Sequence, residues 1–357
     1  MCFFHCALCG KCNYKLINIL YRVNSYRSFK IMLHPEKIFN IQDNTEFEAF
    51  ALETFRYQSK NVKVYRDFTS HLKILPESIN DITKIPFLPV ELFRSQEIIA
   101  LNKAPQIIFE SSTTTGTTPS KHFVADVNIY EDSFLRAFTH FYGDPSNYCI
   151  LALLPSYMER TGSSLVYMAE KLIQLSGHPE SGFYLSEHDK LISVLRFLKK
   201  TGQPTILLGV SYALLDLAEK YEEDLKGVIV METGGMKGRR KEMVREGLHA
   251  FLKRRFNLEQ VHSEYGMTEL LSQAYSKAEG HFFSPPWMKI LIRDSHDPMQ
   301  VLENGITGCI NIIDLANSYS CSFISCSDLG KLNQDGSFDV LGRMDNSDIR
   351  GCNLMIG

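Results

Sequence analysis

Several features that would place a chain in a specialised class are missing from this 357-residue sequence. No uncharged apolar run reaches the ~18 residues that a membrane-spanning helix needs, so we expect no membrane span. Neither sign of charge is in large excess, because the formal net charge is −3 at pH 7, and this balance gives no indication of a nucleic-acid partner. Internal repeats and low-complexity segments are absent, and the ordinary composition excludes a disordered, collagen-like or coiled-coil chain.

Acidic residues are missing from residues 2–35, although this segment carries five Lys or Arg residues. Its basic residues follow its most apolar part, which does not fit a secretory signal. From Glu36 onward the composition becomes that of an ordinary globular protein with acidic residues. We therefore expect residues 1–31 to be a basic, cysteine-containing extension that is not part of the fold.

Four of the nine cysteines lie in this extension, namely Cys2, Cys6, Cys9 and Cys12. The first three have the C-x3-C-x2-C spacing of an iron–sulfur site, and Cys12 with His5 offers a zinc site as the alternative. An iron–sulfur enzyme of that kind places its motif in a loop after the first strand of a barrel, whereas this motif begins at residue 2. The other five cysteines are Cys149, Cys309, Cys321, Cys326 and Cys352. Reduced, buried thiols of a cytoplasmic protein account for most of them, so we expect a cytoplasmic location.

From about residue 125 onward, short apolar segments alternate with amphipathic ones. Strands are predicted over 149–154, 205–209, 227–231 and 260–265, with helices over 131–142, 163–175, 191–198, 214–221 and 244–252. Apolar strands that alternate with helices form mostly parallel sheets covered on both faces, so the fold class is α/β. After about residue 276 the helices give way to a β-rich subdomain, with strands predicted over 288–293, 309–314, 323–326 and 338–341.

The most distinctive local feature is the hydroxyl-rich stretch that runs from Glu110 to Lys121. Its polar residues are Ser111, Ser112, Thr113, Thr114, Thr115, Gly116 and Thr117. Hydroxyls and exposed backbone N–H groups can donate to phosphate oxygens, Gly116 allows close approach, and Lys121 adds positive charge. The spacing is not that of a Walker A loop, and a solvated Ser/Thr linker is the alternative.

Three further features carry groups that can bind a nucleotide. Tyr265, Gly266, Thr268 and Glu269 are predicted to lie where a strand turns into a helix, with an aromatic ring for a base and a carboxylate for Mg²⁺. Asp328, in a predicted turn, can accept from ribose hydroxyls, and Arg343 can place a guanidinium near phosphate or ribose. Taken alone, the first feature is equally compatible with an ordinary strand-to-helix corner.

The order of these features along the chain is more informative than each one alone. A hydroxyl-rich loop, then Y-G-x-T-E, then an Asp and then G-R-x-D resembles the adenylate-forming superfamily, from about residue 33 to the end. That superfamily includes acyl-CoA synthetases, firefly luciferase and the adenylation domains of peptide synthetases. Segments 154–160, 231–240, 285–288 and 349–354 are similar to its acyl-protein synthetase family, also called long-chain-fatty-acid–luciferin-component ligases.

The resemblance implies an adenylate-forming large-domain fold, with mostly parallel sheets flanked by helices, a β-rich subdomain and no C-terminal lid domain. Residues 32–342 would form the adenylation domain, and residues 343–357 a hinge remnant with a cysteine-bearing tail. Family members carry an acyl-accepting cysteine near the C-terminus, and Cys352 stands in the matching place.

The resemblance also implies a ligase reaction that uses ATP and Mg²⁺ to activate a fatty or other carboxylic acid as an acyl-adenylate. Catalytic roles would fall to Cys352 as the thiol nucleophile, to Glu269 as the Mg²⁺ ligand and to Lys121. The nucleotide would be held by the loop 111–117 together with Gly234, Gly235, Tyr265, Gly266, Thr268, Asp328 and Arg343. The thioester on Cys352 would pass to an acyl-acceptor protein such as an acyl reductase.

The sequence also departs from the superfamily pattern. Thr113 stands where many members have glycine, one extra residue precedes Lys121, and the lysine carried by the lid has no counterpart. Lys121, Lys237 or Arg343 would have to supply the missing positive charge. Two other functions are compatible with the motifs: an acyl- or aryl-CoA ligase of the phenylacetate type, and a non-catalytic nucleotide-binding subunit.

Overall fold

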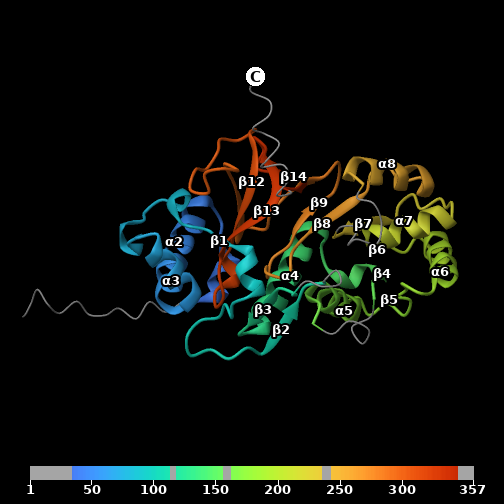
Figure 1. Ribbon diagram of the computed structural model, residues 1–357. Helices are drawn as coiled ribbons and strands as arrows, with labels where there is room; N and C mark the ends of the chain where they lie inside the picture. The colour runs from blue at the N-terminus through green and yellow to red at the C-terminus, as the bar shows by residue number, and fades with distance from the viewer. Residues whose placement is uncertain (1–33, 113–117, 156–161, 235–242, 345–357) are drawn as a thin grey trace, which may run out of the picture. The chain divides into compact units, whose positions relative to one another are not determined.

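The computed structural model describes residues 34–112, 118–155, 162–234 and 243–344, which belong to one unit of the chain (Figure 1). Within these residues the strands form two six-stranded sheets and a separate hairpin. No helix of the described part combines the length and the apolar character that a bilayer crossing requires.

The first sheet has the strand order β5-β4-β6-β7-β8-β9, and all its neighbouring pairs are parallel except β8 with β9. Its strands are β4 (Cys149–Leu153), β5 (Gly182–Phe183), β6 (Thr205–Val210), β7 (Ile229–Thr233), β8 (His262–Tyr265) and β9 (Ala274–Ser276). β4 and β6 are buried along their whole length, as continuous apolar runs predict. The predicted α/β class and the mostly parallel sheet are confirmed.

Helices connect these strands and cover the sheet. They are α4 (Val127–Tyr142), α5 (Ser164–Ser176), α6 (His188–Thr201), α7 (Ser211–Lys220) and α8 (Arg245–Phe256). From β4 the chain moves outward to β5 through α5, and then returns past β4 to β6, β7 and β8. Because parallel crossovers are right-handed, this reversal places α5 on one face and α6, α7 and α8 on the other (Figure 1).

The second sheet is the predicted β-rich part, with the order β10-β14-β13-β12-β11 and β1 added in parallel to β13. Its strands are β1 (Leu88–Pro89), β10 (His281–Phe282), β11 (Met288–Arg293), β12 (Thr307–Asp314), β13 (Phe323–Leu332) and β14 (Phe338–Arg343). Helices α2 (Asn44–Asn61) and α3 (Lys63–His71) pack against it, because Phe55 and Tyr65 both make ring contacts with Phe323. Gln58 of α2 donates to the carbonyl oxygen of Asn317 at 2.9 Å and fixes the segment between β12 and β13.

Short elements complete the chain. The hairpin consists of β2 (Ile107–Glu110) and β3 (Lys121–Val124), paired in antiparallel. The 3₁₀ helices are η1 (Pro35–Asn40), η2 (Pro76–Ser78), η3 (Ile82–Lys84), η4 (Val90–Arg94), η5 (Pro145–Asn147) and η6 (Leu315–Asn317). Of these, η4 contacts both β3 and β13 and therefore joins the hairpin to the second sheet.

The structure differs from the sequence-based expectations at two places near the expected site. No helix follows Tyr265, because residues 266–273 form an irregular loop that returns as β9. The carboxylate of Asp314 accepts the backbone N–H groups of Leu271 and Ser272, which a helix would direct to its own carbonyls. Asp328 lies inside β13 rather than in a turn, beside a register shift between Leu329 and Gly330.

Candidate functional site

The carboxyl ends of β6, β7 and β8 lie along one edge of the parallel sheet, where α/β folds commonly bind ligands. Gly234 follows β7 with a φ of +63°, a conformation that glycine adopts without strain. Gly266 follows β8, and a Cβ atom there would lie 2.6 Å from an Oε atom of Glu264. Gly234 therefore occupies a position where the backbone favours glycine, and a side chain at Gly266 would displace the Glu264 carboxylate, at the edge predicted to hold the nucleotide.

The hairpin keeps the two ends of the hydroxyl-rich stretch together. The N–H of Ser111 donates to the carbonyl oxygen of Ser120 at 3.0 Å, and the N–H of Ser120 donates to the Ser111 hydroxyl at 2.9 Å. Lys121 is half-exposed and pairs with Glu110 at 3.2 Å, so its ammonium group remains available to solvent. Ser112 is exposed, whereas Thr113, Thr114, Thr115, Gly116 and Thr117 lie outside the described residues.

Glu269 is a buried carboxylate on the loop after β8, only 7% exposed. Burial raises its pKa, and a hydrogen bond from the Ser120 hydroxyl and the positive charges of Arg343 and Arg94 oppose that rise. The predicted metal-ligating residue thus lies at the hairpin of β2 and β3, whose strands flank the expected phosphate loop and which we call the phosphate hairpin. No sequence motif indicated this contact between residues 120 and 269.

The surroundings of Glu269 fit a magnesium ion that is bound mainly through a substrate. Among the described residues, no three His, Cys, Asp or Glu side chains are grouped as a self-contained metal site. Mg²⁺ is commonly bound through one or two carboxylates, with phosphate oxygens and water as the other ligands. One buried carboxylate at the hairpin that flanks the expected phosphate loop therefore matches this ion better than it matches zinc or calcium.

Tyr265, Asp328 and Arg343 form a hydrogen-bonded row across the two sheets. The Tyr265 hydroxyl donates to Asp328 Oδ2 at 2.9 Å, and Arg343 Nε donates to Asp328 Oδ1 at 3.4 Å. The Tyr265 ring is buried edge-on between Phe282 and Phe338, and burial raises its pKa well above the ordinary value. Contact with an adenine ring stays a prediction for Tyr265, whose hydroxyl here holds the carboxylate expected to bind ribose.

Arg94 is a candidate site residue that the sequence did not single out. It ends η4, an element held by Phe93, whose ring packs against His122, and by Glu91, which accepts from the Ser327 hydroxyl at 3.0 Å. Arg94 is exposed, and its charge acts on the buried Glu269 carboxylate. One basic residue in a proline-punctuated stretch carries no motif, so only the packing of η4 could place it here.

A second unforeseen group, Glu232 of β7 with Arg245 of α8, links the two sheets. Arg245 Nε donates to Glu232 Oε1 at 3.0 Å, and its Nη1 donates to the Val340 carbonyl of β14 at 2.8 Å. Its guanidinium also lies 4.9 Å from the ring centroid of Phe282. Burial opposes ionisation of Glu232, but hydrogen bonding by His249 and the charge of Arg245 lower its pKa. This link fixes β14, which carries Arg343, against the parallel sheet.

Comparison with known protein families adds a second line of observation. A family model described as "Acyl-protein synthetase, LuxE" matches residues 34–357. The chain belongs to the acyl-protein synthetase family. A comparison with curated proteins gave no match.

Solved structures similar to this acyl-protein synthetase family member are adenylate-forming ligases. The 2-hydroxyisobutyryl-CoA ligase with 2-HIB-AMP and CoA in the thioesterification state has a TM-score of 0.65 at 13% identity, covering 87% of this chain and 71% of that one. The open conformation of the same ligase has a TM-score of 0.63 at 12% identity, and the match covers 85% of this chain and 70% of that one. ATP-bound MatB from Rhodopseudomonas palustris has a TM-score of 0.49 at 16% identity. That match covers 66% of this chain and 47% of the MatB chain. The two likenesses to the 2-hydroxyisobutyryl-CoA ligase concern the fold, and they agree with the predicted adenylate-forming fold.

The thiol nucleophile expected from the sequence would have to be reactive, and the described cysteines are poor candidates for it. Cys149, Cys309, Cys321 and Cys326 are all buried. Burial raises the pKa of Cys149 to about 11 and of Cys321 to about 12, and it raises those of Cys309 and Cys326 as well. A thiol in that state is protonated and unreactive near neutral pH. Gly235, Lys237 and Cys352, also expected at the site, lie outside the described residues.

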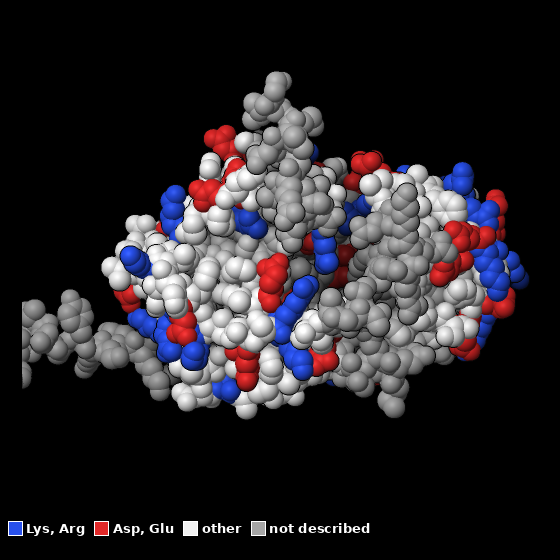
Figure 2. All heavy atoms as spheres, viewed as in Figure 1, with Lys and Arg blue, Asp and Glu red and all other residues white. Residues whose placement is uncertain are grey.

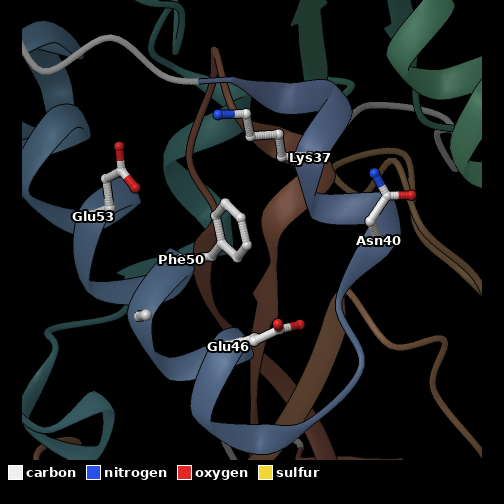
Figure 3. Close-up of a pocket in the computed structure, with 6 residues that line it drawn as sticks. Lys37, Asn40, Glu46, Phe50 and Glu53 are labelled. Carbon is white, nitrogen blue, oxygen red and sulfur yellow. The ribbon is translucent and has the colours of Figure 1, made fainter.

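A surface hollow of about 350 Å³ lies apart from these groups, between η1 and α2 (Figure 3). Phe50 stands in it, with Lys37 and Glu53 to one side and Asn40 and Glu46 to the other. None of its lining residues is an expected site residue. On the face shown in Figure 2, basic and acidic side chains are interspersed.

Proposed function

We propose that this protein activates a carboxylic acid with ATP as an acyl-adenylate and then transfers the acyl group to the thiol of Cys352. The observation that carries the first step is the position of the buried Glu269 carboxylate at the phosphate hairpin, where His122 of β3 lies 2.9 Å from the carbonyl oxygen of Thr268 and Ser120 favours the ionised carboxylate. Membership of the acyl-protein synthetase family supports both steps. A fatty acid is the substrate that this membership favours.

In the first step, a carboxylate oxygen of the acid attacks the α-phosphorus of ATP, and the bond to the β-phosphate oxygen breaks. Acyl-adenylate and pyrophosphate are the products. Lys121, Arg94 and Arg343 supply positive charge for the phosphates, and Asp328 accepts from the ribose hydroxyls. Glu269 would hold Mg²⁺, and that ion would supply positive charge to offset the negative charge that develops on the leaving pyrophosphate.

In the second step, the thiolate of Cys352 attacks the acyl carbon, a thioester forms and AMP leaves with the electron pair of the broken bond. The thioester then passes to an acceptor protein, of which an acyl reductase is one example. The buried state of the four described thiols supports a nucleophile elsewhere in the chain.

The first step is tested by exchange of labelled pyrophosphate into ATP, measured with a series of carboxylic acids of increasing chain length. We expect exchange only when an acid and Mg²⁺ are both present. Glu53→Gln is the matched control for Glu269→Gln, because Glu53 lines the separate hollow. No exchange with any acid would favour a non-catalytic nucleotide-binding subunit.

The second step is tested with a radiolabelled acid, ATP and the Cys352→Ser variant. Wild type should retain label on the protein after denaturation, in a form that hydroxylamine releases, and Cys352→Ser should not. Cys149→Ser, which alters a buried thiol hydrogen-bonded to Ser181, should label normally. Acyl transfer to free coenzyme A that survives Cys352→Ser, without any protein thioester in wild type, would instead indicate an acyl- or aryl-CoA ligase.

A further inference from the structure

His122 lies on β3 directly after Lys121 and is completely buried. Both of its ring nitrogens have partners: Nδ1 lies 2.9 Å from the carbonyl oxygen of Thr268, and Nε2 lies 2.9 Å from the hydroxyl of Ser320. The ring also packs edge-on against Phe93 of η4, with 5.7 Å between ring centroids. The histidine therefore connects the phosphate hairpin to the loop that carries Glu269.

The chemistry of the two partners determines which ring nitrogen of His122 carries the proton. A carbonyl oxygen can only accept, so Nδ1 must carry the proton that is donated to Thr268. In the neutral ring Nε2 is then an acceptor, and the Ser320 hydroxyl donates to it. In the hydrogen bond to Thr268, Nδ1 of His122 on the hairpin is therefore the donor, and the carbonyl oxygen on the loop is the acceptor.

The hairpin holds the Glu269 loop at two points. Ser120 and His122 are two residues apart, so their side chains face the same side of the strand while Lys121 faces the other. The Ser120 side chain favours the ionised form of the Glu269 carboxylate, and Nδ1 of His122 lies 2.9 Å from the carbonyl oxygen of the preceding residue, Thr268. Together these contacts set the position of the carboxylate relative to the phosphate hairpin.

The segment after β12 holds the same loop from another direction. Asn317 Nδ2 donates to the carbonyl oxygen of Glu269 at 2.8 Å, and its neighbour Ser320 is the residue that donates to His122. The N–H of Ser320 in turn donates to the Asn317 carbonyl at 3.1 Å. Successive carbonyls of the loop, at Thr268 and Glu269, are therefore bound by buried side chains from two separate segments.

We propose that His122 is a positioning residue for metal binding, which acts through Thr268 to hold the Glu269 carboxylate at the phosphate hairpin. This inference rests on the proposed function, because it takes Glu269 as the Mg²⁺ ligand. Residues that orient a metal ligand through hydrogen bonds commonly change metal affinity when they are replaced, even though they never touch the ion.

Two substitutions separate the two nitrogens of His122. The amide nitrogen of Asn stands as many bonds from Cα as Nδ1, and that of Gln as many as Nε2. His122→Asn therefore keeps a donor for Thr268, whereas His122→Gln keeps a group beside Ser320 and loses the bond to Thr268. Each variant leaves one buried partner unsatisfied, so both should lower Tm by a few degrees, to a similar extent.

The distinguishing measurement is calorimetric titration of Mg²⁺ into the full-length protein with a non-hydrolysable ATP analogue, which needs no turnover. His122→Gln should weaken Mg²⁺ binding about tenfold or more, and His122→Asn by less than about threefold. Ser320→Ala is the control, because it removes the partner of Nε2 and leaves the Thr268 bond. It should lower Tm without changing Mg²⁺ affinity.

Equal weakening by His122→Asn and His122→Gln, or weakening by Ser320→Ala as large as that by His122→Gln, would show that His122 only stabilises the fold. Unchanged Mg²⁺ affinity in both histidine variants would overturn the inference while leaving the proposed function standing. If wild type bound no nucleotide in the presence of Mg²⁺, the proposed function and this inference would both fall.

Discussion

At the scale of single residues, Glu269 shows how a proposed metal ligand opposes stability. Its carboxylate is buried, and burial raises its pKa although Ser120, Arg343 and Arg94 favour the charged form. A group whose pKa is raised on folding stabilises the fold at low pH, and this stabilisation is lost as the pH rises through the folded pKa. Near neutral pH the ionised Glu269 therefore destabilises the folded protein.

Glu269→Gln should consequently separate stability from activity. We expect Tm at pH 8 to be unchanged or higher, because the amide has no charge to bury, while pyrophosphate exchange falls about 100-fold or more. Thermal melts and exchange rates of the same preparations check this. A large loss of Tm together with retained exchange would contradict the assignment of Glu269.

Arg94 provides a second prediction at this scale. Arg94→Gln should raise the KM for ATP about tenfold, and Arg94→Lys should recover part of the loss, because a positive charge near Glu269 is restored. Arg254→Gln is the control, since its guanidinium lies over the Phe251 ring on α8. Steady-state kinetics with varied ATP test it, and an unchanged KM in Arg94→Gln would remove Arg94 from the site.

At the scale of elements, the loop 266–273 keeps its shape through a buried carboxylate on a different sheet. Asp314 accepts from the N–H groups of Leu271, Ser272 and Ala316 and from the Ser272 hydroxyl. Burial raises its pKa to about 6, against hydrogen bonds that favour the ionised form. The end of β12 thus determines that the residues after β8 form a loop instead of a helix.

Asp314→Asn should therefore destabilise the protein. One accepting oxygen becomes an NH₂ group that faces donors, so we expect a loss of about 2–4 kcal/mol in the free energy of unfolding. Asp335→Asn is the matched control, because Asp335 accepts from Ser337 on the surface, and it should have little effect. Urea denaturation compares the two variants, and equal effects would contradict a structural role for Asp314.

At the scale of the whole molecule, buried histidines make stability depend on pH. Burial lowers the pKa of His122 and of His262 to about 4, and the charge of Lys277 adds to the effect at His262. Between pH 4 and 6.5 the unfolded chain then binds more protons at these sites than the folded protein does. Asp314 acts in the opposite sense, because its folded pKa lies above its ordinary value.

Glu269, whose pKa burial also raises, acts in the same sense as Asp314. We expect the two histidines to outweigh these two carboxylates, so the free energy of unfolding should rise as the pH increases from 4.5 to 6.5. Urea denaturation at both values measures the rise. His262→Gln should make it smaller, since Gln does not titrate, whereas His296→Gln, at an exposed site, should leave it unchanged. A stability that stayed level or fell over this range would contradict these shifted pKa values.

The sequence by itself determined four strands of the parallel sheet and the five helices around it, since continuous apolar runs such as Cys149–Leu153 have to be buried on both faces. The short edge strands β5 and β9 were not predicted. The order of its motifs was also sufficient to indicate the family. The sequence missed contacts that depend on where distant segments meet: Ser120 with Glu269, His122 with Thr268, and Arg245 between two sheets. Local periodicity reports burial and hydrogen bonding within a segment, whereas these partners come from separate segments. Only packing of the hairpin and both sheets determines that the residues after Tyr265 form a loop, with a carboxylate beside the phosphate hairpin.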